Sequence, residues 1–218
     1  MKFAELRLDS TLQSAVDKMG YAEATPIQSQ AMPLILERKD VSGLAQTGTG
    51  KTAAFVLPLM ERILRSRPLA ETATDEEKEL AAARGFPDWR SQNFILVLVP
   101  TRELAEQVYE NVMIFSEFSG LRGVSVYGGT SYDKQKEALQ KGVEFVVATP
   151  GRLIDLYKEH VVDLKQVRAI VFDEADRMFD MGFKDDMKYI LQRVPRERQF
   201  LVFSATLNFD VLNTAYQF

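Results

Sequence analysis

The stretch AQTGTGKT (45–52) combines glycines, hydroxyl groups and a lysine directly after a short apolar run. A strand that leads into a glycine-rich turn and then a helix directs backbone N–H groups and a positive helix terminus at an anion. Gly48 and Gly50 allow positive φ angles and a close approach of the backbone. Lys51 would reach the β- and γ-phosphates of a nucleoside triphosphate, and the Thr52 hydroxyl would bind Mg²⁺. The alternative is a plain turn between strand and helix, which has no use for the lysine.

Adjacent acids close another apolar run, AIVFDEA (169–175). An acid at the end of a strand can hold Mg²⁺ through its water shell, and the next acid can orient or deprotonate the water that attacks a γ-phosphate. We therefore assign Asp173 to the metal and Glu174 to the water. Adjacent acids alone are a weak signal in a chain with 31 acidic residues, and their place at a strand end beside a phosphate loop strengthens it.

Hydroxyl groups end the apolar run FLVFSAT (200–206). Ser204 and Thr206 place these hydroxyls at a strand end of the same kind. The alternative is that they only cap a following helix.

Three further segments follow apolar runs, namely PTRELA (100–105), Gly128-Gly129 and TPGR (149–152). Thr101 and Thr149 can cap helices, and exposed amides at such ends can receive a nucleic-acid phosphate. Arg102 and Arg152 add positive charge. Each segment alone is more often a helix start, but three of them at one sheet edge favour a track for a nucleic-acid backbone over sequence readout.

The elements that position these groups form an alternating pattern. Apolar, largely β-branched runs cover 41–45, 94–100, 123–129, 145–150, 169–175 and 200–206. Helical patterns cover 51–67, 102–118, 134–140 and 151–157. The alternation predicts an α/β fold with a doubly wound, mostly parallel sheet and helices on both faces. Ligands of such sheets bind outside the carboxyl ends of the strands. Pro58 is expected to kink or shorten the helix over 51–67.

The composition narrows the class of protein. The 218 residues are 46% hydrophobic, carry a net charge of -4 and include no cysteine, which excludes disulfides and thiolate zinc sites. The single histidine, His160, lies in a polar stretch and is expected at the surface. The negative charge implies that any nucleic acid is held by groups placed in a groove. No apolar membrane span or secretory signal is evident, so we expect a cytoplasmic protein without membrane contact.

Residues 66–93 form a polar excursion between the helix over 51–67 and the next apolar run. Thr74 and Glu77 have the spacing of a capping box, and Gly85 can end the helix that follows. We expect a short exposed helix between two polar arms, either as a solvated segment or as a surface for a protein partner.

Taken in order, the motifs are ATPIQ (24–28), AQTGTGKT, PTRELA, the glycine pair, TPGR, DEAD (173–176) and SAT (204–206). Over essentially its whole length, 1–218, the chain resembles the N-terminal RecA-like domain of the DEAD-box RNA helicases. The resemblance implies a RecA-like P-loop fold, ATP and Mg²⁺ as cofactors, and RNA as a partner. It also implies a second RecA-like domain that completes ATP hydrolysis, so we expect this chain, which stops soon after SAT, to be one domain of a longer protein.

The resemblance also implies roles for single residues. Gln28, within an adenine-reading region over 1–29, would read the adenine edge, and Thr25 would support the phosphate loop. Phe3 and Tyr21 would pack on or near the adenine. The remaining nucleotide contacts would be Ala45, Gln46, Thr47, Gly48, Thr49, Gly50, Lys51 and Thr52. Catalysis would involve Lys51, Asp173 and Glu174, with Ser204 and Thr206 coupling the acids to domain closure. The RNA backbone would contact Pro100, Thr101, Arg102, Gly129, Thr149, Gly151 and Arg152. Selection of RNA over DNA would come from 2′-hydroxyl contacts and a bent strand.

Some features depart from the common pattern or leave other functions open. Ala24 stands where the family often has proline, whereas an alanine at position 45 belongs to the family's pattern. A related DNA helicase or translocase is one rival. Another is an ATP-gated RNA clamp or scaffold in which the segment 66–93 recruits partners through Phe86 and Trp89.

Overall fold

The core of the computed structural model, which describes residues 1–206 and residue 213, is a six-stranded sheet in the order β1-β6-β5-β2-β4-β3. The strands are β1 (Val41–Leu44), β2 (Phe94–Leu98), β3 (Gly123–Val126), β4 (Phe145–Ala148), β5 (Val167–Asp173) and β6 (Gln199–Ser204). Every pairing between these strands is parallel. All the apolar runs identified in the sequence are therefore confirmed as strands.

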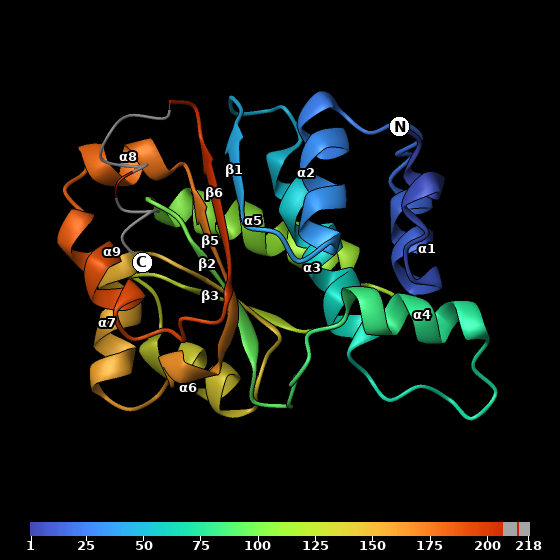
Figure 1. The fold of residues 1–218 in the computed structure, drawn as a ribbon. Helices are drawn as coiled ribbons and strands as arrows, with labels where there is room; N and C mark the ends of the chain where they lie inside the picture. The colour runs from blue at the N-terminus through green and yellow to red at the C-terminus, as the bar shows by residue number, and fades with distance from the viewer. Residues whose placement is uncertain (207–212, 214–218) are drawn as a thin grey trace.

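Both faces of the sheet are buried, as parallel strands require. In β2, Ile95 and Val97 join one hydrophobic cluster, and Leu96 and Leu98 join the other. The first cluster includes α1 (Ser10–Lys18), α2 (Pro26–Leu36), α3 (Lys51–Arg65) and α5 (Arg102–Phe115). The second includes α6 (Tyr132–Gln140), α7 (Pro150–Lys158), α8 (Ala175–Asp180) and α9 (Lys184–Leu191). Figure 1 shows these two groups of helices on either side of the sheet, which confirms the doubly wound fold.

The helix α3 runs through Pro58 to Arg65, so Pro58 does not shorten it, whereas a kink at Pro58 stays a prediction. Proline has no N–H to offer the carbonyl of Ala54, one turn earlier. Every residue of α3 from Ala53 to Leu64 is nevertheless buried. Packing on all sides of the helix outweighs the missing hydrogen bond.

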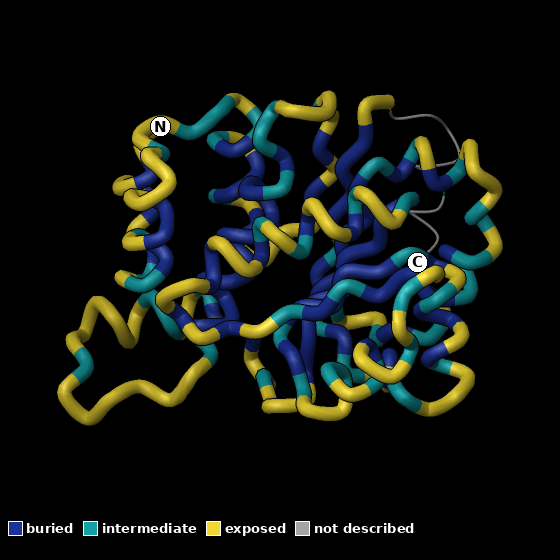
Figure 2. The backbone as a smooth tube through the Cα atoms, turned by 180° about the vertical axis from the view of Figure 1, so that it is seen from behind, coloured by how far each residue is buried: buried dark blue, intermediate teal, exposed yellow. Residues whose placement is uncertain are grey.

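The excursion contains the expected helix, α4 (Asp75–Arg84), and Thr74 and Glu77 form its capping box. No residue of α4 is buried, and Figure 2 shows the arm before it exposed along most of its length. Arginines nevertheless fasten α4 to the body of the protein. Arg38 Nη2 donates to the Ala82 carbonyl at 2.6 Å, and Arg84 Nη1 donates to the Arg7 carbonyl at 3.1 Å.

Phe86 and Trp89, the anchors considered for a partner at 66–93, pack against the core, and the partner itself stays a prediction. Phe86 is only 6% exposed and belongs to the hydrophobic core, against which Trp89 also packs. Their ring centroids lie 5.2 Å apart, and the Arg62 guanidinium lies 3.7 Å from the centroid of the Phe86 ring. Phe86 and Trp89 therefore pack the end of the segment 66–93 against the core.

Two smaller expectations concern the surface. His160 is exposed at the end of α7, as expected. Over residues 1–206 and 213, we find no helix whose length and apolar character would let it cross a bilayer.

Candidate functional site

The order of the strands divides the strand-end groups into two neighbouring sets. The contiguous strands β1, β6 and β5 end in the phosphate loop, the Ser204 segment and the acids. The contiguous strands β2, β4 and β3 lead into the segments that begin at Pro100, Thr149 and Gly128. Because all the strands are parallel, both sets lie at the same edge of the sheet, side by side (Figure 1).

The phosphate loop (45–50) connects β1 to α3. Gly48 has φ 82°, and Gly50, at the N-cap of α3, has φ 85°, a region that glycine enters without strain. Thr49 Oγ1 donates to the Gln46 carbonyl at 2.7 Å, which closes the turn. The Gly50 cap provides no side chain to the first amides of α3, so those amides can receive an anion.

Lys51 and Asp173 meet at the centre of the first set. Lys51 Nζ lies 3.6 Å from Asp173 Oδ1, and the two side chains are 6% and 2% exposed. Burial raises the pKa of Asp173 to about 6, against the attraction of Lys51, and the nearby charge of Glu174 raises it further. Ionisation of the buried Asp173 carboxyl is therefore unfavourable, and an additional cation nearby would stabilise the ionised form.

Glu174 is directed from the end of β5 toward the phosphate loop. Its backbone is left-handed, with φ 55°, and such strain in a residue other than glycine is concentrated at functional sites. Its N–H donates to Asp173 Oδ1 at 3.0 Å. Its carboxylate accepts a hydrogen bond from Thr47 Oγ1 at 3.4 Å and pairs with Arg177 Nη1 at 3.2 Å. Glu174 therefore contacts the phosphate loop through Thr47.

Asp176 joins the acids to β6, a role that the sequence reasoning missed. Asp176 Oδ2 accepts hydrogen bonds from the Thr206 N–H at 3.0 Å and from Thr206 Oγ1 at 2.9 Å, and its own N–H donates to Ser204 Oγ at 3.2 Å. Burial tends to raise the pKa of Asp176, but hydrogen bonds from Ser204, Thr206 and the backbone outweigh it and lower the pKa. The hydroxyls of both residues thus contact the acid cluster directly.

Gln28 links the N-terminal region to the phosphate loop. It is 4% exposed, its Oε1 accepts from the Thr25 N–H at 2.9 Å, and its Nε2 donates to the Gly50 carbonyl at 3.1 Å. Thr25 and Gln28 form the capping box of α2, a helix that the T-x-x-Q spacing could have predicted. An added Cβ at Gly50 would lie 2.4 Å from Gln28 Nε2, so this contact leaves room only for glycine.

The place of Phe3 on or near the adenine stays a prediction, and its ring is buried. Its ring is 1% exposed in the hydrophobic core, so direct contact with a base is excluded in this conformation. The ring instead supports Tyr21, whose centroid lies 5.8 Å from that of Phe3 and 6.3 Å from that of Phe115. Tyr21, which is partly exposed, remains the aromatic candidate for an adenine contact.

The second set places cations and helix starts on one edge. Thr101 caps α5 by accepting from the Leu104 N–H at 3.3 Å, whereas Thr149, at the N-cap of α7, makes no such bond. The Arg102 guanidinium lies 5.3 Å from the centroid of the Tyr127 ring. The other candidates for RNA contact at this edge are Pro100, Gly129, which has φ 87°, Gly151 and Arg152. Their roles in RNA binding stay predictions.

Gln135 connects the parts of this second set and also escaped the sequence reasoning. It is 6% exposed on α6. Its Nε2 donates to the Tyr127 carbonyl at 3.1 Å and to Thr130 Oγ1 at 2.6 Å, and its Oε1 accepts from Arg152 Nη1 at 3.4 Å. The Gln135 amide therefore links the turn over 127–130, which contains the glycine pair, to Arg152.

The donors around Lys51 fit a magnesium ion. Thr52 is the second residue of α3, and the Asp173 carboxylate lies 3.6 Å from Nζ of the preceding residue, Lys51. The described residues contain no cluster of three acidic, histidine or cysteine ligands. Magnesium does not need such a cluster, because it keeps several waters and is commonly held by one or two protein oxygens together with substrate phosphates.

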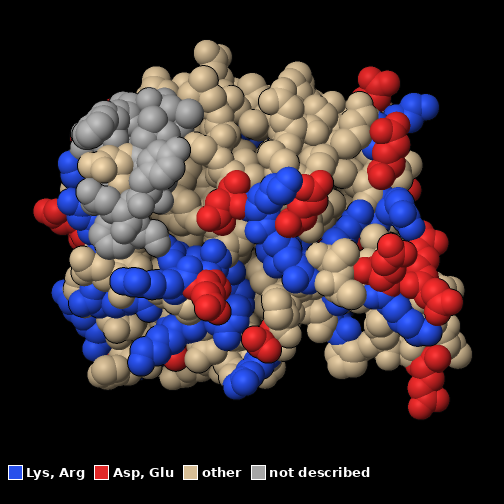
Figure 3. Space-filling model, in the orientation of Figure 1, with Lys and Arg blue, Asp and Glu red and all other residues tan. Residues whose placement is uncertain are grey.

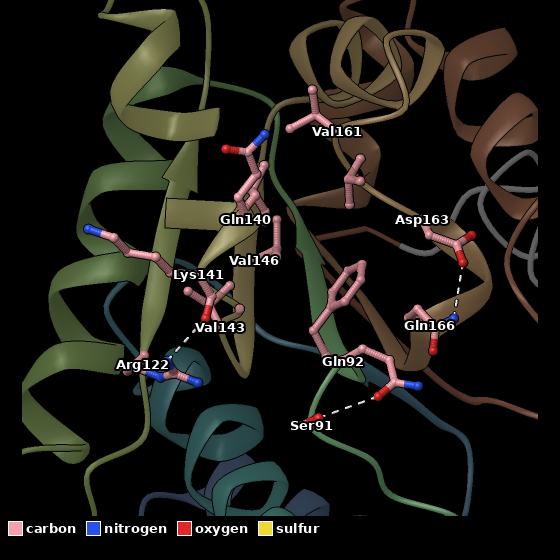
Figure 4. A pocket seen from close by; sticks show the side chains of 14 residues that line it. Ser91, Gln92, Arg122, Gln140, Lys141, Val143, Val146, Val161, Asp163 and Gln166 are labelled. Carbon is pink, nitrogen blue, oxygen red and sulfur yellow. Dashed lines mark hydrogen bonds between the residues drawn. The ribbon is translucent and has the colours of Figure 1, made fainter. Parts of the chain in front are cut away.

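A hollow of about 380 Å³ lies at the opposite edge of the sheet. It is lined by Gln92, Arg122, Val143 and Gln166, which precede or begin β2, β3, β4 and β5 (Figure 4). Several of its polar groups bond to one another or to neighbouring residues; the Gln166 amide, for example, donates to Asp163 Oδ2 at 3.0 Å. None of the strand-end groups described above lines this hollow, so it is separate from the candidate site.

Comparisons with known proteins agree with this geometry. A family model described as DEAD/DEAH box helicase matches residues 25–215. The DEAD-box ATP-dependent RNA helicase CshA of Streptococcus pneumoniae is 44% identical over 218 residues, which are 100% of this chain and 37% of that protein. The ATP-dependent RNA helicase RhlB of Xanthomonas oryzae is 43% identical, over 99% of this chain and 35% of that protein. The crystal structure of a hypothetical ATP-dependent RNA helicase from Sulfolobus tokodaii aligns with TM-score 0.78 and 34% identity, over 97% of this chain and 55% of that one.

Proposed function

The chain belongs to the DEAD/DEAH box helicase family, and from this premise we propose that it is the nucleotide-binding domain of an ATP-dependent RNA helicase. The observation that carries the proposal is the buried contact of 3.6 Å between Lys51 and Asp173, beside the open amides of the phosphate loop. The chain spans about 37% of the length of its curated relative CshA. We therefore assign ATP hydrolysis and strand separation to a longer protein with a second RecA-like domain.

ATP would bind with its phosphates on the loop 45–50 and the first turn of α3. Backbone N–H groups and the helix terminus there favour negative charge. Lys51 is held in place by the buried Asp173 carboxylate. It would contact the β- and γ-phosphates and neutralise the charge that develops on them during transfer.

Thr52 and Asp173 would hold the magnesium ion, which would supply positive charge to offset the negative charge of the phosphates. Glu174 would accept the proton of the attacking water or orient that water. The Thr47 hydroxyl and Arg177, which both contact the Glu174 carboxylate, would keep it facing the loop.

Gln28 would read the adenine. In this structure its amide is engaged by Thr25 and Gly50. Recognition of the base by the Gln28 Nε2 would therefore release the Gly50 carbonyl at the N-cap of α3, so that base recognition and the conformation of the phosphate loop are coupled.

RNA would bind along the second set of strand ends, through amides and through Arg102 and Arg152. The hydroxyls of Ser204 and Thr206, which contact Asp176, would transmit domain closure to the acids. The ends of β5 and β2 are neighbours in the sheet, so the RNA path and the ATP site share a boundary.

Nucleotide titration tests the first part of the proposal. We expect the chain to bind a fluorescent ATP analogue more tightly with magnesium than without it. Lys51→Ala should weaken binding by at least about tenfold, because charge-assisted hydrogen bonds contribute about 1.5–3 kcal/mol. The control Lys78→Ala, on exposed α4, should bind like the unmodified chain. Equal affinity for all three proteins would contradict the assignment of Lys51.

Hydrolysis and unwinding test the second part. We expect ATP hydrolysis by the longer protein to be stimulated by RNA more than by DNA of the same sequence, and this chain alone to separate no strands. Preferential stimulation by DNA would favour a DNA translocase. Robust ATP-driven unwinding by this chain alone would refute the two-domain account.

A further inference from the structure

A basic depression lies away from the candidate site, where the chain approaches β5 and β6. It measures about 450 Å³, and five of its lining residues are basic, namely Arg38, Arg62, Lys165, Arg168 and Arg198. They come from the end of α2, from α3 and from the segments that begin β5 and precede β6. Figure 3 shows Lys and Arg side chains in the middle of the face it draws, with Asp and Glu side chains beside them. This clustering contrasts with the net charge of -4 of the whole chain.

Basic residues outnumber acidic ones in the lining of the depression. Two of its lining residues are acidic, Asp88 and Glu197. Among the residues that the structure describes, Arg38, Arg62 and Lys165 form no ion pair with a carboxylate. Each bonds instead to neutral groups or faces solvent. Arginine and lysine bind carboxylates through charge-assisted hydrogen bonds, so these three residues offer positive charge to an acid from elsewhere.

Arg62 is the floor of the depression and is only 3% exposed. Its Nε donates to the Arg84 carbonyl at 2.9 Å, its Nη1 donates to Gln199 Oε1, and its guanidinium stacks on Phe86 at 3.7 Å. Burial and the positive charge of Arg38 lower the pKa of Arg62 to about 9. A buried guanidinium held by neutral partners is costly for a monomer, and a bound carboxylate would offset that cost.

We propose that the basic depression is a docking site for an acidic segment of a partner protein. The lining favours a peptide over a nucleic-acid strand. Pro87 and Pro195 add apolar surface, whereas Phe86, 6% exposed, offers no free ring on which a base could stack. The proposal is independent of the ATP and RNA chemistry at the other edge of the sheet.

Charge reversal at the rim tests this proposal. The variant Arg38→Glu/Lys165→Glu changes two exposed residues that line the depression. Its matched control, Lys78→Glu/Lys141→Glu, makes the same change in net charge at exposed sites outside the depression. The probes are labelled poly-glutamate, labelled poly-glutamine and labelled oligouridine, and binding is followed by fluorescence anisotropy at low and physiological salt. Urea denaturation of each variant verifies that the fold is intact.

We expect poly-glutamate, and not poly-glutamine, to bind the unmodified chain. The rim variant should lower that affinity on the order of tenfold for each reversed charge, while the control changes it little. Oligouridine binding should be unaffected by the rim variant. If the rim variant and the control lose the same affinity for poly-glutamate, the effect depends on net charge alone and the docking site is refuted. Absence of poly-glutamate binding to the unmodified chain would refute it as well. Loss of oligouridine binding in the rim variant alone would show a second RNA contact instead of a peptide site.

If the rim variant unfolds, Arg168→Gln provides the same test with a smaller change. It removes one positive charge from the lining and should lower the affinity for poly-glutamate severalfold at low salt. An unchanged affinity in this variant would overturn the proposal as well.

Discussion

The replacement Asp173→Asn tests the energetics of the buried pair with Lys51. Burial raises the pKa of Asp173 from 3.8 to about 6, so the folded chain binds this proton more tightly than the unfolded chain does. Stability from this group is then fully present below about pH 4 and is lost as the pH rises through about 6. At about 1.4 kcal/mol for each pH unit, the ionised carboxylate costs the fold about 3 kcal/mol at neutral pH.

Asparagine has nearly the shape of the protonated acid and does not ionise. We therefore expect Asp173→Asn to match the parent chain at about pH 4 and to exceed its free energy of unfolding at about pH 7.5 by up to about 3 kcal/mol. The gain is an upper limit, because Lys51 loses a partner. Magnesium-dependent nucleotide binding should be lost in the same variant, so that a gain in stability accompanies a loss of function.

Urea denaturation without nucleotide, at several pH values, measures this difference. Asp180→Asn, in an exposed position of α8, is the control and should show little dependence on pH. Removing one member of a net stabilising buried pair costs about 3–5 kcal/mol. If Asp173→Asn is destabilised by that amount at about pH 7.5, the pair holds the fold together and our reasoning about its cost is wrong.

Other substitutions test the remaining contacts. Gly50→Ala and Gly182→Ala should each lower the free energy of unfolding in urea by about 1–2 kcal/mol, because both glycines have left-handed backbones. Only Gly50→Ala should also weaken ATP binding, since its Cβ would meet Gln28. Equal ATP affinity in the two variants would rule out the clash. Gln28→Ala should relax the preference for ATP over GTP in a competition titration, and an unchanged preference would remove its adenine role. Gln135→Leu should lower RNA affinity at least severalfold without changing ATP affinity, because Arg152 and the glycine-pair turn lose their common anchor; a parallel loss of ATP affinity would indicate general damage. In the longer protein, Glu174→Gln should bind ATP normally and hydrolyse it much more slowly, and normal turnover would exclude Glu174 as the residue that acts on water.

Local signals in the sequence were enough to predict the strands of the sheet and the helix α4. Buried parallel strands are apolar on both faces, so each run could be recognised without its neighbours, and the capping box at Thr74 fixed the start of α4. The phosphate loop could be read for the same reason, since its glycines, Lys51 and Thr52 are contiguous. The parallel order then placed the acids of β5 near the loop.

The missed features depend on contacts between distant segments. Asp176 forms its hydrogen bonds with residues 28 and 30 positions away, and nothing local distinguishes it from the acids around it. Gln135 looks like an ordinary helix residue until α6 and α7 are packed together. The burial of Phe3 and the survival of α3 beyond Pro58 are likewise decided by the core, which overrides local preference.

A crystal structure of this chain with magnesium and a non-hydrolysable ATP analogue is the most direct test of the central claim. The triphosphate should lie on the amides of residues 45–52, with Lys51 on its terminal phosphates and the ion between the Thr52 hydroxyl and the Asp173 carboxylate. Phosphates bound elsewhere, or an ion that contacts neither of these oxygens, would contradict it.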